Sequence, residues 1–308
     1  MKLFIQLMTN QLTGANLFPR FLVAFLVLFS IQVTANVGSS HNSFNVTVSG
    51  KGQDVILIPG LMSDASVWSV LAKELTKTHK LHLVNIAGFG ATPKIEGQSL
   101  EKVKLELFEY IEQNKLNQPT IIGHSLGGFM AFWMASSSPE KIGRIISVDG
   151  LPFIGPVFTG SNNSTVKSLG AQANQMRAYF SHLSASQLDA QNRRSINRQA
   201  TSKESKEKII TMASQSDPAI VGSLMFTLMS TDLRDKISEI KNPALLIGAA
   251  GGFGNNEAKM EAKKLYQQQL SKLKGAKLVM NNNSRHFIMF DQPEWLTKQV
   301  IAFLSDSK

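Results

Sequence analysis

The stretch TIIGHSLGG, residues 120–128, decides the fold of this chain. A short apolar run is followed by the pattern G-x-S-x-G with Ser125 at its centre, and an apolar segment with helical character follows at 129–136. Glycines on either side of a serine let the chain turn sharply from strand to helix and hold the serine in a strained conformation. The free N–H groups at the start of the next helix favour an oxyanion beside the hydroxyl. The stretch therefore predicts that Ser125 is a nucleophile at a strand-to-helix turn.

On both sides of this turn, short apolar runs alternate with amphipathic segments, which is typical of a parallel sheet covered by helices. The expected strands are 44–48, 54–58, 80–86, 119–123, 142–148, 244–248 and 277–280, and the expected helices are 66–75, 100–114, 129–136, 257–273 and 293–304. Between them, residues 151–241 have a helical pattern with no strong strand. The sequence predicts an α/β fold with a mostly parallel central sheet and helices on both faces. Its core comprises 36–150 and 242–308, and a helical cap is inserted at 151–241.

The first 35 residues have a different composition. They carry only Lys2 and Arg20 as charged residues, followed by an apolar run over 21–29 and the small-residue sequence Val33-Thr34-Ala35. This layout is typical of a secretory signal peptide, and the apolar run is short for a membrane span. We expect cleavage after Ala35 and a secreted or periplasmic protein without a stable membrane span in the mature chain. An uncleaved N-terminal anchor is the alternative.

Charge and cysteine content narrow the possible partners. The 308-residue chain has a net charge of +10, and without Lys2 and Arg20 it keeps 30 basic against 22 acidic residues. These charges are scattered and do not cluster with aromatic residues, so we expect no nucleic-acid partner. The absence of cysteine excludes a thiol nucleophile and a thiolate metal site. No metal-ligand constellation is present in the sequence, and we expect a small-molecule substrate without a metal or cofactor.

Several further motifs follow the same order along the chain as in one known family. These are the turn Pro59-Gly60-Leu61, Trp68 after it, the loop Gly88-Phe89-Gly90, the GHSLGG turn and a late His286. Over its whole mature length the chain resembles the α/β-hydrolase family. The resemblance implies a catalytic triad in the order serine, acid, histidine, and a cap or lid where the helical insertion lies. It does not identify a substrate.

A serine hydroxyl is a weak nucleophile and needs a base. His286 lies just after the last strand, where the resembled family has its base and where parallel sheets carry their ligand sites. His124 lies inside the serine turn, and we expect its ring to pack beneath that turn. The other four histidines, His41, His79, His82 and His182, lie in poorly patterned or surface-like stretches.

The acid is the point at which this sequence departs from many of the relatives it resembles. They have an aspartate after the strand that corresponds to 244–248, but Gly251 stands about there. Other relatives have the acid after the strand that precedes the cap, where this chain has Asp149. We therefore expect Asp149 to be the acid, and a residue that only caps a turn is the alternative. The remaining candidates are Glu257, Asp217 and Asp232, of which the last two lie in the insertion.

Two backbone N–H groups are expected to form the oxyanion hole: that of Leu126, which follows the nucleophile, and that of Leu61, with Met62 as the alternative. The chain is then a serine hydrolase that cleaves an ester or related acyl bond through an acyl-enzyme. Methionine and aromatic residues of the insertion suggest an apolar acyl or aryl ester. The sequence does not choose among carboxylesterase, lipase, lactonase, amidase, carbon–carbon bond hydrolase and perhydrolase. The alternative is an inactive binding or signalling protein on a hydrolase scaffold, which the missing acid after the strand at 244–248 would support.

Overall fold

The structure is a computed structural model that describes residues 43–306. The predicted signal peptide and its cleavage after Ala35 lie outside the described residues. Within residues 43–306, no helix combines the length and the apolar character that a membrane crossing requires.

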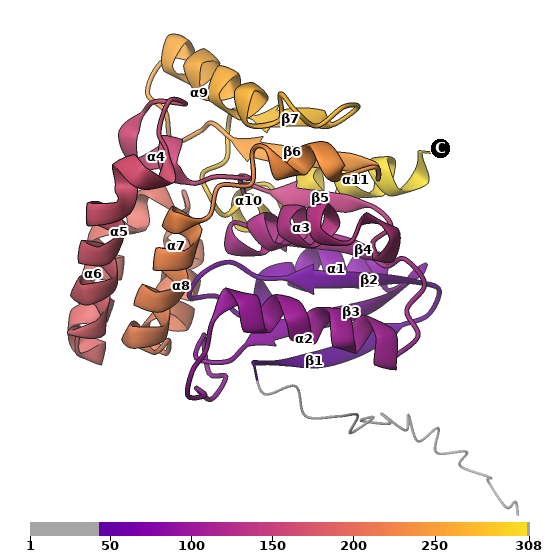
Figure 1. The fold of residues 1–308 in the computed structure, drawn as a ribbon, viewed down its shortest axis with the longest axis horizontal. Coiled ribbons are helices and arrows are strands. Elements are labelled where there is room, and N and C mark those ends of the chain that lie inside the picture. The colour runs from indigo at the N-terminus through magenta and orange to yellow at the C-terminus, as the bar shows by residue number, and fades with distance from the viewer. Residues whose placement is uncertain (1–42, 307–308) are drawn as a thin grey trace, which may run out of the picture. The chain divides into compact units, whose positions relative to one another are not determined.

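A seven-stranded sheet forms the centre of the described chain (Figure 1). Its order is β1-β3-β2-β4-β5-β6-β7, in which β1 pairs antiparallel with β3 and all other pairs are parallel. The strands are β1 (Phe44–Gly50), β2 (Gln53–Ile58), β3 (His79–Ile86), β4 (Thr120–His124), β5 (Ile145–Val148), β6 (Ala244–Ala249) and β7 (Lys277–Asn281). The predicted fold class, a mostly parallel sheet in an α/β protein, is confirmed.

Helices cover both faces of this sheet. The helices of the core are α1 (Ser69–Leu75), α2 (Leu100–Gln113), α3 (Leu126–Ser137), α9 (Asn256–Gln269), α10 (Ile288–Asp291) and α11 (Pro293–Ser305). Because strand side chains alternate between faces, Ile121 packs in the core with α2 and α3, whereas its neighbour Ile122 packs in the core with α1 and α11. In Figure 1, α2 and α3 lie in front of the sheet.

Five α-helices follow one another between the adjacent strands β5 and β6, in the segment for which the sequence predicts a cap. They are α4 (Gly155–Thr159), α5 (Val166–Ser181), α6 (Ala185–Ser195), α7 (Lys203–Ser214) and α8 (Pro218–Ser230), with short 3-10 helices η3 (Ile196–Arg198) and η4 (Lys236–Glu239). Figure 1 shows α5 to α8 grouped at one end of the sheet. We call residues 151–241 the cap from here on.

Several elements differ from the expected pattern. The helix expected at 66–75 begins as a 3-10 turn, η1 (Ala65–Trp68), before α1 starts. Strand β5 begins at Ile145, later than expected, although Ile142 is fully buried. The one-turn helix α10 was not expected, because four residues are too few to show a helical period.

Candidate active site

Ser125 lies in a sharp turn between β4 and α3. Its backbone has φ 52° and ψ −112°, a conformation that residues with a side chain rarely adopt. A Cβ atom at Gly123 would lie 2.0 Å from the carbonyl oxygen of Gly127, and one at Gly127 would lie 2.2 Å from that of Ile58. Only glycine fits at either position, so the two glycines of G-x-S-x-G make the turn possible.

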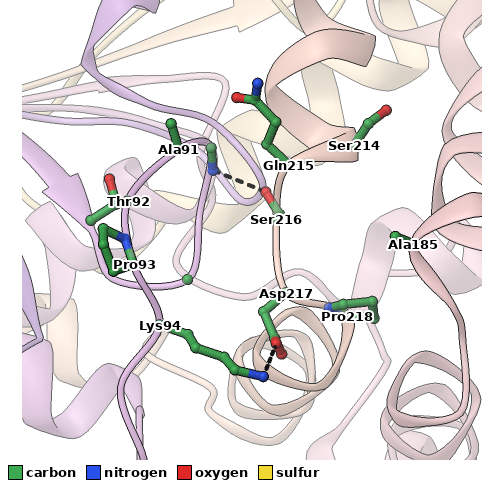
Figure 2. A pocket seen from close by; sticks show the side chains of 12 residues that line it. Ala91, Thr92, Pro93, Lys94, Ala185, Ser214, Gln215, Ser216, Asp217 and Pro218 are labelled. Atoms are coloured by element: carbon green, nitrogen blue, oxygen red, sulfur yellow. Dashed lines mark hydrogen bonds and ion pairs between the residues drawn. The ribbon is translucent and has the colours of Figure 1, made fainter.

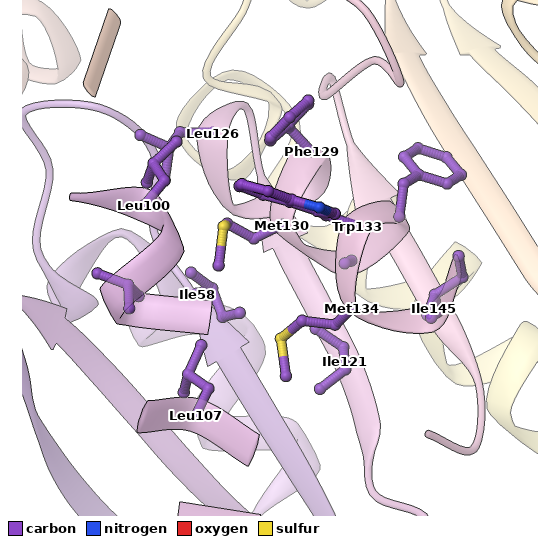
Figure 3. Close-up of a cluster of buried hydrophobic side chains, with 14 of the residues drawn as sticks. Ile58, Leu100, Leu107, Ile121, Leu126, Phe129, Met130, Trp133, Met134 and Ile145 are labelled. Carbon is purple, nitrogen blue, oxygen red and sulfur yellow. The ribbon is translucent and has the colours of Figure 1, made fainter. Parts of the chain in front are cut away.

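The helix that follows Ser125 is anchored in the core. Residues 126–135 of α3 are all buried. Figure 3 shows Leu126, Met130 and Met134 of this helix packed with Ile58 and Ile121 of the neighbouring strands. Each fully buried side chain of this size contributes about 1.5–3 kcal/mol. This packing offsets the backbone strain at the serine, which costs about 1–3 kcal/mol.

His286, in the loop after β7, bonds Asp149, which directly follows β5. The distance from Nδ1 of His286 to Oδ2 of Asp149 is 2.6 Å. Nδ1–H donates to the carboxylate, so the lone pair of the neutral ring is on Nε2. The side chain of His286 is 29% exposed and that of Asp149 only 7%, so the acid is shielded while the histidine is accessible. Ser125, His286 and Asp149 all line one cavity.

Two further groups hold the other oxygen of Asp149. Oδ1 accepts from the hydroxyl of Tyr266 over 2.7 Å and from the amide of Ala249 over 2.7 Å. Tyr266 is buried, and burial together with the charge of Asp149 raises its pKa well above the usual value, so its hydroxyl stays protonated and donates. The carboxylate is therefore fixed with Oδ2 directed at His286. Sequence reasoning missed Tyr266, although it is a buried aromatic residue on a helix, α9, that is otherwise mostly polar.

The chain at Gly251 has no room for the acid that the resembled family often carries there. The amide of Gly251 donates to the carbonyl of Ser284 over 2.8 Å. A Cβ atom at Gly251 would lie 2.6 Å from that same carbonyl oxygen. The end of β6 therefore contributes a backbone donor to Asp149, the amide of Ala249, and no acid of its own.

The three other acidic candidates have different partners. Asp217 caps the start of α8 and pairs with Lys94 over 2.8 Å, at the edge of a small pocket where α8 meets the loop after β3 (Figure 2). Asp232 pairs with Arg234. Glu257 is exposed in the first turn of α9. The structure brings none of these three carboxylates into hydrogen-bond contact with His286.

His124, directly before Ser125 in the chain, is fully buried. Its Nε2 lies 3.1 Å from the carbonyl oxygen of His286, and its ring centroid lies 4.6 Å from that of His286. Burial, followed by the proximity of His286, lowers the pKa of His124 well below its usual value. A neutral His124 can thus donate to the His286 backbone and support the loop that carries it.

The residues whose amides are expected to form an oxyanion hole lie around the same cavity. Leu126 is the first residue of α3, so its N–H has no acceptor within the helix. Leu61 and Met62 follow β2, and Met62 has a positive φ of 57°. All three residues line the cavity together with Ser125.

The expectation of a surface-like environment is wrong for His82. Its side chain is only 1% exposed. One ring nitrogen bonds Asp54 over 2.9 Å, and the other bonds the hydroxyl of Tyr110 over 2.7 Å. His182 is exposed, His79 is half-buried in β3, and His41 lies outside the described residues.

The cavity around Ser125 has a volume of about 840 Å³ and extends between core and cap. Of the nine cap aromatic and methionine residues, Phe158 and Met225 line it. Phe153 and Met229 instead form a small core within the cap. The cap thus uses these residue types both for its own packing and for the cavity wall.

One cap segment is hydrogen-bonded to the His286 loop. The guanidinium of Arg285 donates to the carbonyls of Asn197 and Ala200, and the amide of Phe287 donates to the carbonyl of Gln199. Both chain neighbours of His286 are therefore held by the cap, so the position of the cap and that of His286 are coupled.

This geometry, a parallel sheet with a strained serine, a histidine and an aspartate at the carboxyl ends of its strands beneath a helical cap, defines a class of hydrolase folds. Residues 55–293, more than half of the chain, match the family model of the alpha/beta hydrolase fold. The chain belongs to the alpha/beta hydrolase family.

Curated relatives of the chain include three that are named pimeloyl-[acyl-carrier protein] methyl ester esterase. The protein from Vibrio cholerae serotype O1 is 30% identical over 105 residues, 34% of this chain and 40% of the relative. That from Aeromonas salmonicida is 33% identical over 131 residues, 39% of this chain and 50% of the relative. That from Nitrosomonas europaea is 22% identical over 213 residues, 67% of this chain and 79% of the relative. The chain thus spans half or less of the length of the first two.

Solved structures share the fold. A hydrolase from Pseudomonas aeruginosa PA01 has a TM-score of 0.72 at 17% identity and covers 87% of this chain and 97% of its own. The enol-lactonase from Burkholderia xenovorans LB400 has a TM-score of 0.67 at 18% identity and covers 85% and 96%. At such low identity the likeness shows the fold alone.

Proposed function

We propose that this chain hydrolyses carboxylic esters through an acyl-enzyme, with Ser125 as nucleophile, His286 as base and Asp149 as the acid of the triad. The hydrogen bond between Nδ1 of His286 and Oδ2 of Asp149 carries the proposal. It orients the imidazole and leaves Nε2 available for the proton of a hydroxyl in the same cavity.

In this mechanism, Nε2 of His286 takes the proton of Ser125 while Oγ attacks the ester carbonyl. The amides of Leu126 and Leu61 receive the negative charge of the tetrahedral intermediate. The intermediate expels the alkoxide, which leaves as the alcohol with the proton from Nε2. Water then attacks the acyl-enzyme by the same route and releases the carboxylic acid. Asp149 stays ionised throughout and stabilises the imidazolium.

The relatives favour an ester among the acyl bonds, and the cavity indicates the character of its acyl or aryl part. Methyl ester hydrolysis stands in the name of the curated relatives. Phe158, Met225 and Leu228 give the cavity apolar walls that suit an acyl chain or an aryl group. The substrate class we propose is therefore an ester with an apolar acyl or aryl part.

The alternative, an inactive binding protein, rested on the missing acid after β6. The bond between Asp149 and His286 supplies an acid from β5 and weighs against this alternative. A binder would also have no need for the strained backbone at Ser125.

A fluorophosphonate probe tests the proposal directly. Such probes react with activated serines, so the purified protein should be labelled at Ser125, and Ser125→Ala should abolish labelling. The same variant should lower kcat for the best of a panel of alkyl and aryl esters by at least about 10⁴-fold. The panel should include a lactone and an amide, which separate the bond types. Labelling that persists in Ser125→Ala would overturn the assignment of the nucleophile.

We further propose export of the mature enzyme from the cytoplasm, on the basis of the signal-peptide layout of residues 1–35. N-terminal sequencing of the protein after expression with its leader should then begin at Asn36. A product that still begins at Met1 and fractionates with membranes would favour the anchor instead.

A further inference from the structure

The cavity around Ser125 has two kinds of wall. Residues from α4 and α8, such as Val157, Phe158 and Met225, are apolar. The cap segment 192–199, at the end of α6 and in η3, contributes mainly amides and a guanidinium, and Arg285 adds a second guanidinium. A purely hydrocarbon substrate would leave this second wall without a partner.

The polar wall carries an excess of positive charge. Arg198 and Arg285 line the cavity, whereas Asp149 is the only carboxylate among the described residues that does. Both oxygens of Asp149 are already bonded, to His286, Tyr266 and Ala249. The cavity therefore favours an anion, because charges in a concave, partly desolvated site act strongly on a ligand.

The two arginines are not neutralised within residues 43–306. The guanidinium of Arg285 donates to two backbone carbonyls and forms no ion pair. Its neighbour Asp291 uses its carboxylate oxygens on the amides of Arg285 and Thr201 and on the hydroxyl of Thr201. Arg198 is exposed and has no hydrogen bond or ion pair to any residue in this range. A carboxylate is the group that a free guanidinium binds best, through two parallel hydrogen bonds.

Asn192 provides a second, independent sign of a ligand. Asn192 as a residue is 7% exposed, and its Nδ2 has no hydrogen-bond partner among the described residues. An unsatisfied buried donor costs about 1–3 kcal/mol, so such a donor beside a binding cavity points to an acceptor that the ligand supplies.

We propose that the substrate of this enzyme is an ester that carries a carboxylate remote from the scissile bond, and that Arg198 and Asn192 bind this carboxylate. This inference rests on the proposed ester hydrolysis and deepens it. The apolar wall takes the chain between the two ends of the substrate, the ester carbonyl lies at Ser125, and the carboxylate lies at the cap segment 192–199.

Matched substrates of different charge test the proposal. The monomethyl esters of adipic, suberic and sebacic acid carry a terminal carboxylate, and methyl hexanoate, octanoate and decanoate replace it by a methyl group. We expect the best half-ester to exceed its neutral match in kcat/KM by about 10-fold or more. Arg198→Gln should lower that ratio by about 10–100-fold, and Asn192→Leu by about 10-fold.

Arg194→Gln is the matched control. Arg194 is an exposed arginine of α6, the helix directly before η3, and does not line the cavity, so this variant should leave the ratio unchanged. A ratio near one for every chain length, or a ratio that Arg198→Gln does not change, would overturn the proposed carboxylate site.

A binding measurement keeps this outcome separate from failure of the proposed hydrolysis. In Ser125→Ala, the best half-ester should raise the melting temperature more than its neutral match, and Arg198→Gln in that background should remove the difference. If the wild-type protein binds the half-esters in this way but is not labelled by fluorophosphonate and turns over no ester, the hydrolysis fails and the carboxylate site stands. Equal shifts with both ligands would contradict the site itself.

Discussion

Two histidines of this chain, His82 and His286, each bond an aspartate, and a tyrosine completes each network. In the first network, His82 of β3 lies between Asp54 and Tyr110, and both of its ring nitrogens are bonded. Burial lowers the pKa of His82 and raises that of Tyr110 to about 12, so the ring stays neutral and accepts the phenolic hydrogen bond. Such a ring has no nitrogen left for a substrate proton.

The second network is built so that one nitrogen remains available. Tyr266 bonds the carboxylate of Asp149 and not the ring of His286, so Nδ1 is held while Nε2 stays unbonded within the described chain. Asp149 and His286 also lie beyond the carboxyl ends of their strands, whereas His82 is in the middle of one. The comparison shows that an aspartate–histidine pair becomes a candidate base through the free nitrogen and its access to a cavity, and not through the pair itself.

The largest expected effect is that of Asp149→Asn. The hydroxyl of Tyr266 and the amide of Ala249 both donate to one side-chain oxygen, so they would keep the amide oxygen of the new asparagine at that place. The NH₂ group would then face Nδ1 of His286 and force the ring proton onto Nε2, the wrong nitrogen for a base. We expect kcat for the best ester to fall by about 10⁴-fold, measured by steady-state kinetics.

Asp54→Asn is the matched control for this change. Nε2–H of His82 can donate to the oxygen of an asparagine, because Tyr110 already fixes the hydrogen bond at Nδ1. We expect activity within about twofold of the wild type, with a stability loss of about 1 kcal/mol. Comparable losses of activity in both variants would show that the two networks do not differ in function as their geometry suggests.

A smaller effect is expected for Tyr266→Phe. This change removes one donor from Asp149 without opening a large cavity, and hydrogen bonds to charged groups contribute about 1.5–3 kcal/mol. We expect kcat to fall by about 10–100-fold while KM changes little. A carboxylate with one donor fewer is held less firmly in the orientation that directs Oδ2 at His286. Tyr110→Phe removes the matching hydroxyl from the His82 network and should leave kcat and KM as in the wild type. Steady-state kinetics of both variants measure the contrast, and an unchanged kcat in Tyr266→Phe would contradict the orienting role of Tyr266.

Much of this site could be predicted because its signals are local in sequence. The pattern around Ser125 and the position of His286 after a strand need no knowledge of contacts. The acid was harder to predict, because it can follow either β5 or β6 in the resembled family. The loop after β6 shows only that Gly251 is not an acid, and this does not by itself point to Asp149 after β5. Tyr266 could not be predicted, since its contact with Asp149 joins a helix to a distant strand end, and a buried tyrosine at helical spacing is usually core. The buried position of His82 was missed for a similar reason, because its partners lie on β2 and α2.

The last expected effect concerns stability and two buried histidines, His82 and His124. Burial lowers the pKa of His82 below 6.5, with Lys80 adding to that effect and Asp54 opposing it, and lowers that of His124 well below 6.5. Below pH 6.5 the unfolded chain then binds more protons than the folded chain. The contribution of the two neutral histidines to the free energy of unfolding should be complete above pH 6.5. It should fall as the pH drops, by at most about 1.4 kcal/mol per pH unit for each of the two histidines.

Urea denaturation at pH 7.5, 6.0 and 5.0 measures this dependence. Glutamine does not titrate, so His82→Gln should remove the part of the pH dependence that His82 contributes and leave the part that His124 contributes. The exposed His182 offers the control, since His182→Gln should leave the dependence as it is in the wild type. If stability were constant or rose on acidification, His82 and His124 would have to take up protons in the folded chain. The ring of His82 would then carry a charge between Asp54 and Tyr110, and the contrast with His286 would no longer rest on a neutral, fully bonded ring.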